Sequence, residues 1–441
     1  MAIMRSVVGG IVLALSLQSV PAQWSPLQRS VAHYTSFLIP VGASIQGLGA
    51  PGNWSQIASD GLGGIVVAEP SYTPQLQFSI RTAVWSGATN GWQFATLASN
   101  LPDNPLGLAA SKSHYWYYTA SDAVYEGARR VPQVPTLRGN LRSLLGLPSG
   151  WTIGECCTNG RDVFYLVATG SDWRVYALDM LGGSPPVSPP DGRLVAVIPP
   201  TTAAYAGDLD IGRDGNLVIV TFGGSPGPKV LCIDAVDGTL LWQEAVPTWT
   251  SYGKLAFDAW ESRVSVAHDG NLGEIIEKVL GSTGTWTLLW YFPYLTLFDV
   301  ETMVCQPFEV FGSGCANSAG SGPRVSWQGL PLQGQSFDVK LREAEASGFA
   351  CLWLGISDTS WLGLPLPYDA MSVGAPGCNL LVSVDIPYAV PVDANGRASI
   401  SVAVPVNQEL AGLEVFAQTA STCSVNSFGF ASSDALIVRV R

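Results

Sequence analysis

The segment from Tyr205 to Pro247 constrains the fold of this chain most. Its sequence, YAGDLDIGRDGNLVIVTFGGSPGPKVLCIDAVDGTLLWQEAVP, contains short apolar runs separated by Asp-Gly and Gly-Pro turns. Gly and Asp readily adopt the positive φ that tight hairpin turns require. The segment therefore predicts three or four short antiparallel strands, and it indicates no particular reaction.

Weaker copies of this pattern occur on both sides of it. We place the copies near 54–97, 106–145, 151–198, 205–246 and 252–292. Their period is about 45 to 50 residues, which is the length of a four-stranded β-propeller blade. Solenoid repeats are usually shorter and more regular. Residues 31–50 and 295–310 can form one further blade from both ends of the repeat region, so we predict six blades.

A second domain follows the repeats. After Phe311 a run of small residues, FGSGCANSAGSGP, is typical of a linker or entry loop. About seven strand-like runs follow, mostly alternating, and Asn395-Gly396 is typical of a tight hairpin. We predict an all-β protein, with a propeller over 23–310 and an antiparallel β-sandwich over 311–441.

The N-terminus, MAIMRSVVGGIVLALSLQSVPAQ, has the pattern of a signal peptide covering residues 1–22. Its apolar stretch is shorter than the roughly 20 residues that span a bilayer, and no later segment is long enough. The net charge of −12 argues against nucleic acid as a partner. We expect a secreted or cell-envelope protein, monomeric and without a transmembrane segment after cleavage.

Export affects how the eight cysteines are interpreted, because thiols outside the cytoplasm tend to form disulfides. All eight follow the predicted cleavage site, four in each predicted domain. Four cysteines allow three pairings, and the sequence does not choose among them. The candidates are Cys156, Cys157, Cys232 and Cys305 in the first domain and Cys315, Cys351, Cys378 and Cys423 in the second.

The stretch 311–441 resembles a C-terminal module that ends many otherwise unrelated secreted proteins of planctomycete bacteria. The motifs that carry the resemblance include FGSGC, WQGLPLQGQSF, GAPGCNLLVSVD and a final apolar strand. The resemblance implies export and a role in surface retention, sorting or adhesion, with no catalytic residues. It also implies a disulfide between Cys315 and Cys378, which leaves Cys351 with Cys423.

The run VLCIDAVDGTLLW is similar to the repeat of quinoprotein-like and WD40-like propellers, with Asp234, Gly238 and Trp242 in the family's places. The other copies keep only fragments of this pattern, so blade packing explains these residues without a cofactor. Quinoprotein alcohol dehydrogenases carry a vicinal disulfide beneath the quinone, which draws attention to Cys156-Cys157. Those enzymes have eight blades, whereas this chain has room for about six.

Other patterns suggest chemistry less specifically. Gly223 to Gly227 matches the G-x-S-x-G nucleophile elbow, but the residue after Ser225 is Pro226, which has no N–H for an oxyanion hole. The consecutive aromatic residues from Tyr115 to Tyr118 are typical of packing between blades rather than of a ligand platform.

Asp208, Asp210 and Asp214 in GDLDIGRDGN are weak candidates for a calcium site. Their spacing departs from the calcium-loop pattern, and an Asp-Gly turn alone accounts for Asp214. We expect no other metal and no cofactor.

The sequence favours an exported, non-catalytic binding protein. Loops at one propeller end would recognise an extracellular glycan, peptide or protein, and the C-terminal module would retain the protein at the surface. The alternative is a propeller hydrolase, lyase or quinoprotein-type oxidoreductase with its site in the axial channel. Three or more converging His, Asp or Glu side chains there would favour the enzyme. A channel filled by small or apolar side chains would favour binding.

Overall fold

The computed structural model describes the chain from residue 30 to residue 441. The gaps in this description are 35–36, 41–49, 52–55, 61, 63, 72–76, 87–90, 102, 130–133, 181–191, 200–204, 223–226, 248–252, 269–273, 292–296 and 303–305. The predicted signal peptide therefore lies outside the described residues. The described chain is all-β, with few helical residues.

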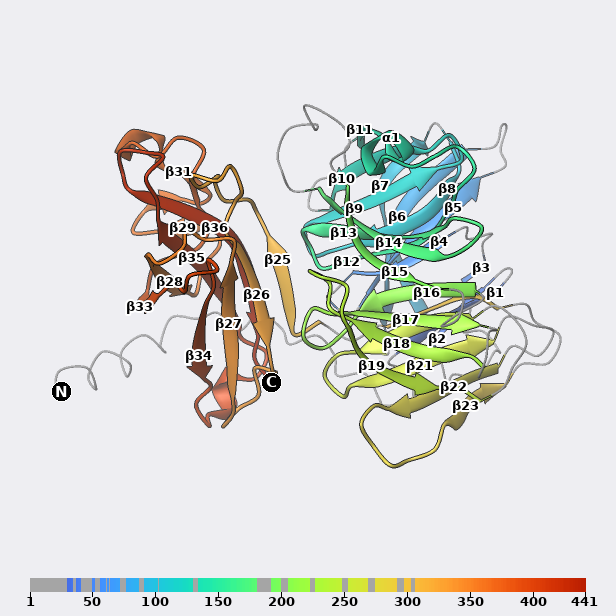
Figure 1. The fold of residues 1–441 in the computed structure, drawn as a ribbon. Coiled ribbons are helices and arrows are strands. Elements are labelled where there is room, and N and C mark those ends of the chain that lie inside the picture. Colours follow the sequence, from blue (N-terminus) through green and yellow to red (C-terminus); the bar gives the residue numbers. More distant parts are fainter. Residues whose placement is uncertain are drawn as a thin grey trace.

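Six antiparallel four-stranded sheets form the first unit within the described residues, which we call the six-sheet unit (Figure 1). In spatial order, their strands are β4 (Gln56–Ser59), β5 (Ile65–Ser71), β6 (Gln77–Ser86), β7 (Gly91–Leu101); β8 (Pro105–Ala110), β9 (His114–Thr119), β10 (Ala123–Ala128), β11 (Thr136–Asn140); β12 (Thr152–Thr158), β13 (Asp162–Ala168), β14 (Trp173–Asp179), β15 (Arg193–Ile198); β16 (Tyr205–Ile211), β17 (Leu217–Phe222), β18 (Lys229–Ile233), β19 (Leu240–Ala245); β20 (Gly253–Asp258), β21 (Arg263–His268), β22 (Glu274–Val279), β23 (Thr287–Tyr291); and β24 (Leu297–Thr302), β1 (Ser30–Tyr34), β2 (Phe37–Pro40), β3 (Ala50–Pro51). A short helix, α1 (Leu141–Leu145), follows β11.

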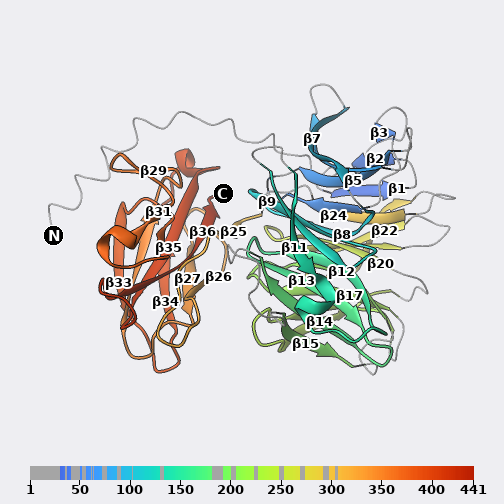
Figure 2. The ribbon, with the colours of Figure 1, turned by 90° about the horizontal axis from the view of Figure 1, so that it is seen from above.

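The first strand of each sheet contacts the first strand of the next. β4 contacts β8, and the contacts continue through β12, β16, β20 and β24 back to β4. The last of these sheets joins β24 to β1, so both ends of the repeat region share one sheet, as the sequence predicts. These first strands therefore lie at the centre of the unit, and the later strands of each sheet lie further out (Figures 1 and 2).

The apolar runs of the sequence become strands buried between neighbouring sheets. Strand β17 is buried from Leu217 to Thr221 because side chains on both of its faces contact another sheet. Tyr115 and Tyr117 pack toward the sheet of β4, whereas Trp116 packs toward the sheet of β12. All three are at most 1% exposed, so the aromatic run fills the spaces between sheets, as predicted.

The C-terminal unit contains two facing sheets. One has the strand order β25 (Phe308–Phe311), β36 (Phe430–Arg439), β35 (Glu414–Thr422), β28 (Phe349–Gly355), β33 (Ile386–Pro391), and the other has β26 (Arg324–Gln328), β27 (Ser336–Arg342), β34 (Ala398–Ala403). Phe308, Trp327, Phe337, Leu352 and Leu436 belong to the core that the two sheets share. Short elements complete the unit: β29 (Ser360–Trp361), β30 (Leu364–Pro365), β31 (Tyr368–Asp369), β32 (Asn379–Leu380), and the 3-10 turns Ala370–Val373 and Gln408–Leu410.

The start of the C-terminal unit differs from the predicted boundary at residue 311. Strand β25 begins at Phe308 and pairs with β36, with Phe308 opposite Val438. The small-residue run after Phe311 is therefore not a linker between units, because it connects β25 to β26 within the second unit. Small residues are needed there, since a Cβ on Gly314 would lie 1.9 Å from the carbonyl oxygen of Ser432.

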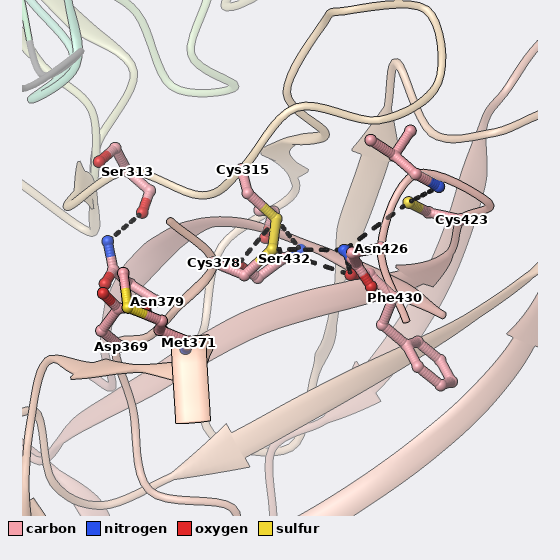
Figure 3. Close-up of a disulfide and its surroundings, with 12 residues drawn as sticks. Ser313, Cys315, Asp369, Met371, Cys378, Asn379, Cys423, Asn426, Phe430 and Ser432 are labelled. Atoms are coloured by element: carbon pink, nitrogen blue, oxygen red, sulfur yellow. Dashed lines mark hydrogen bonds between the residues drawn. A yellow bond between two sulfur atoms is a disulfide. The ribbon is translucent and has the colours of Figure 1, made fainter. Parts of the chain in front are cut away.

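The disulfide between Cys315 and Cys378 is present and closes this connection against the loop before β32 (Figure 3). The expected pairing of Cys351 with Cys423 is wrong, because both are free thiols. Cys351 lies opposite Ala420 in the strand pair β28–β35, so Cys423 is three residues further along. Three residues of strand span about 10 Å and reverse the facing side, which no disulfide bridges.

Replacing Cys315 and Cys378 together by serine is expected to lower the free energy of unfolding by about 2–4 kcal/mol. The disulfide closes a loop with a sequence separation of 63 residues, and its removal restores chain entropy to the unfolded state. Denaturant titration of the double variant measures the loss. Cys351→Ser is the matched control, and an equal loss in both proteins would contradict the prediction.

No helix among the residues described here is long and apolar enough to cross a membrane.

Candidate functional site: an axial cavity under the C-terminal unit

A small cavity of about 50 Å³ lies where the central strands meet the C-terminal unit. Strands β4, β8, β12 and β16 supply most of its wall, and Phe308 and Glu309 of β25 lie on the side of the C-terminal unit. Small side chains line much of it, including Ala58, Ser59, Ala109, Ala110 and Ser111. The volume suits a few water molecules and no larger ligand.

Two carboxylates of β16 connect this strand to β20. Asp208 accepts hydrogen bonds from the N–H groups of Leu209 (2.8 Å) and Leu255 (2.9 Å). Asp210 repeats the arrangement with Ile211 (2.7 Å) and Phe257 (2.9 Å). The innermost strand of a sheet has N–H groups without a strand partner, and these carboxylates satisfy two of them on β20.

Asp210 also lines the cavity, and its carboxyl group is strongly perturbed. Burial raises the pKa of Asp210 to about 7, although the two N–H donors oppose the shift. A buried carboxyl with such a pKa is a common feature of acid–base sites. Here its oxygens are both engaged by backbone donors, so the geometry indicates a structural role between sheets.

The three aspartates proposed for calcium do not form a ligand set. Asp214 lies in the turn after β16, where it accepts the N–H of Gly329 from the C-terminal unit at 2.9 Å. Asp208 and Asp210 point instead toward β20. No group of three or more His, Cys, Asp or Glu in the described part of the chain is placed to hold a metal ion. The weak calcium prediction is therefore replaced by structural contacts. Asp208 and Asp210 accept backbone N–H groups of β20, and Asp214 accepts that of Gly329.

Cys156 and Cys157 also line the cavity, but they lie on opposite faces of β12. Cys156 packs with the cluster between the sheets of β8 and β12, and Cys157 packs with the cluster between those of β12 and β16. No disulfide joins them. The vicinal ring that a quinone would stack on is therefore not formed. Cys232 is a buried thiol on β18, and Cys305 lies outside the described residues.

An ion pair connects two central strands that are not neighbours. Lys254 of β20 contacts Glu155 of β12, and β16 lies between these strands in the ring of contacts. The side chains are 17% and 22% exposed. The pair therefore crosses the inner side of β16 and links the sheet of β12 to the sheet of β20.

The C-terminal unit is held against the cavity end by buried charges. Arg161, in the turn after β12, contacts Asp434 of β36 (2.5 Å) and Asp179 of β14 (2.7 Å). Arg324 of β26 lies 3.4 Å from Asp162. Burial raises the pKa of both Asp162 and Asp434, against the effect of the arginines. These charges are removed from water, so the contact depends on keeping each one paired.

A second group of charges lies around Glu309 and Glu414. Arg439 of β36 contacts Glu309 and Glu414, each at 3.0 Å. Lys112, in the turn after β8, donates its backbone N–H to Glu309 and its Nζ to Glu414, each at 2.6 Å. Burial opposes the ionised form of Glu414, but Arg439 and Lys112 lower its pKa overall. One network thus joins both units.

Trp327 provides an apolar contact between the units. Its indole N–H donates to the carbonyl of Arg213 at 3.1 Å, and its ring covers Gly215. Gly215 has φ of 73°, and an added Cβ would lie 3.2 Å from the ring. The Asp-Gly turn that suggested a hairpin in the sequence therefore also gives the tryptophan its docking surface.

Of the nucleophile-elbow residues Ser225 and Pro226 and the three histidines of the chain, His114 is the one whose side chain is described, and it does not line the cavity. Ser225 and Pro226 lie outside the described residues, as do the side chains of His33 and His268. His114 stacks on Trp116 and contacts Ser113 at 2.9 Å. The residues that hold the units together, above all Arg161, Asp434 and Trp327, were not foreseen, because no local motif marks a contact between distant segments.

No family model matches this chain, and no curated protein matches it. A solved structure described as a complex of KlAtg21 with the coiled coil of AgAtg16 aligns with 65% of this chain and 80% of that chain, at 8% sequence identity and a TM-score of 0.33. A likeness at this level carries no argument about function.

Proposed function

We propose that this chain is an exported, non-catalytic binding protein, built as a six-bladed β-propeller whose one end is capped by a C-terminal β-sandwich. The ring of contacts among the first strands of the six sheets supports the propeller. The two facing sheets over a shared core support the sandwich.

The cavity at the capped end is the observation that carries the binding function. It is small and lined largely by small side chains, and its carboxylates are committed to structural contacts. Such a cavity provides neither room for a substrate nor converging catalytic groups. Among the described residues, Asp210 has the raised pKa of an acid–base group, but both of its oxygens accept backbone hydrogen bonds, so it does not favour the enzyme alternative.

Binding should occur at the end of the six-sheet unit opposite the C-terminal unit. The turns after β8, β12, β16 and β20 all contact the C-terminal unit, through Lys112, Arg161, Asp214 and Trp260. Antiparallel strands place the turns after the second strands at the other end. There, Arg174 lies over the ring of Trp151 at 4.6 Å. We propose that this open end recognises an extracellular glycan, peptide or protein.

Hydrogen exchange with a bound ligand tests this assignment. The mature chain is screened against immobilised glycans and peptides, and the best binder is used for exchange mass spectrometry. Protection is expected in the open-end turns 120–122, 146–151 and 169–172, with no change at 111–113 or 159–161. Protection confined to the capped-end turns, or chemical turnover of the ligand, would contradict the proposal.

A pair of charge reversals gives an independent check. Arg174→Glu is expected to weaken binding several-fold through lost charge complementarity at the open end. Arg263→Glu is the matched control, because Arg263 lies beside the capped end with a similarly exposed side chain (29% against 28%). Equal effects of the two reversals would indicate that the open end is not the binding surface.

A further inference from the structure

In the C-terminal unit, the side chain of Asn426 lies between the Cys315–Cys378 disulfide and the sulfur of a third cysteine (Figure 3). The third cysteine is Cys423, a free thiol that is 7% exposed and follows β35. The Nδ2 of Asn426 lies 3.8 Å from Sγ of Cys378 and 4.0 Å from Sγ of Cys423. One amide nitrogen thus separates a free thiol from a disulfide.

The surrounding loop fixes the position of Cys423 beside Asn426. The N–H of Val425 points to Sγ of Cys423 at 3.3 Å, so a donor faces the sulfur that would carry negative charge. The backbone N–H of Cys423 donates to the carbonyl of Gly429, which closes a short loop around Asn426. Asn426 itself is only partly buried, and two hydrogen bonds hold its side chain: Nδ2 donates to the carbonyl of Phe430 at 2.8 Å, and Oδ1 accepts the N–H of Gly429 at 2.9 Å. Breaking these two hydrogen bonds would let the amide leave the space between the sulfurs.

We propose that Cys423 is an exchange partner for Cys378, which gives the C-terminal unit two alternative disulfides. The Cys423 thiolate attacks Sγ of Cys378, and the bond between Cys378 and Cys315 breaks. Cys315 leaves as a thiolate and takes up the proton that Cys423 lost. One disulfide and one thiol are present before and after the step, so no external oxidant or reductant is needed.

The exchange would release the connection between β25 and β26. Cys315 anchors this segment to the loop that contains Cys378, and Sγ of Cys315 also accepts the N–H of Ser432 at 3.3 Å. Glu309 of β25 and Arg324 of β26 both take part in contacts with the six-sheet unit. With the Cys378–Cys423 disulfide, the segment between β25 and β26 would lose its covalent anchor. The contacts that Glu309 and Arg324 make with the six-sheet unit would then be weaker. This inference is independent of the proposed binding function.

Disulfide mapping tests the exchange on the full mature chain. The protein is incubated at mildly alkaline pH without added thiol or oxidant and is then quenched with acid. Its thiols are labelled with a maleimide, and it is digested without reduction for mass spectrometry. The expected result is a Cys378–Cys423 peptide pair together with labelled Cys315. Asn426→Ala is expected to raise the fraction of this pair several-fold, because it removes the group between the sulfurs.

Two cysteine variants complete the test. Cys423→Ser is expected to abolish labelling of Cys315, whereas Cys351→Ser, which removes the other free thiol of the unit, is expected to leave the pattern unchanged. If Cys423 is labelled and Cys315 and Cys378 stay unlabelled, in both the unaltered chain and Asn426→Ala, the proposal is overturned. Peptides linked through Cys351 in the same amount would also overturn it, because they would indicate unselective scrambling.

Discussion

Replacing Arg161 by leucine is expected to destabilise the folded protein by about 3–5 kcal/mol, because the change leaves the buried Asp434 without its cation. Arg161 and Asp434 are 12% and 1% exposed and lie 2.5 Å apart. The second oxygen of Asp434 is already committed to the N–H of Val325 at 2.7 Å. Once the guanidinium is gone, the buried carboxyl keeps only the backbone donor and the more distant charge of Arg324. Denaturant unfolding followed by tryptophan fluorescence measures the loss.

A second variant separates the missing charge partner from a general packing defect. Asp434→Asn combined with Arg161→Leu removes both charges and keeps an oxygen acceptor for Val325, so it should recover much of the lost stability. Arg263→Leu is the matched control, because Arg263 lies in partly exposed ion pairs, which typically contribute 0–1 kcal/mol. A loss below about 1 kcal/mol for Arg161→Leu would contradict the assignment of this contact as a buried interface between units.

The fold was largely predictable because its signals are local. The repeat around Tyr205–Pro247 predicted short strands and hairpins, and the described chain has six four-stranded sheets with the expected shared sheet at the two ends. The Cys315–Cys378 disulfide followed from a family resemblance. The pairing of Cys351 with Cys423 failed because it depends on strand register, and a shift of three residues is invisible without the sheet.

The candidate site was much less predictable, because its contacts join distant parts of the chain. Arg161 and Asp434 are 273 positions apart, and neither lies in a recognisable motif. Asp208 and Asp210 were weak calcium candidates because they lie in an acidic, oxygen-rich stretch of a chain that is expected to be exported. Their actual partners are N–H groups of β20, 47 positions away. Carboxylate spacing alone does not distinguish a cation from the edge of a neighbouring sheet.

Asp210 provides the clearest pH-dependent prediction. Its pKa is raised from 3.8 to about 7 in the folded protein, so between these values the folded chain holds a proton that the unfolded chain has released. The stabilisation from this proton is fully present below pH 4 and is lost as the pH rises through 7. We expect the unaltered chain to lose up to about 4 kcal/mol relative to Asp210→Asn across this interval. The cavity beside Asp210 has room for water, which would screen the carboxylate, so this figure is an upper bound.

Paired denaturant titrations of the two proteins at several pH values measure this difference. Other buried groups with raised pKa values, such as Asp162 and Asp434, are common to both proteins, so their contributions cancel. Asp208→Asn is the control, because it makes the same chemical change in the same kind of contact with β20. It measures how much stability is lost when an amide replaces a carboxyl group that accepts these hydrogen bonds. A stability difference between the unaltered chain and Asp210→Asn that stays constant from pH 4 to 8 would show that Asp210 is ionised throughout. The wall of the cavity would then carry a charge throughout this pH range, which would contradict the raised pKa of Asp210.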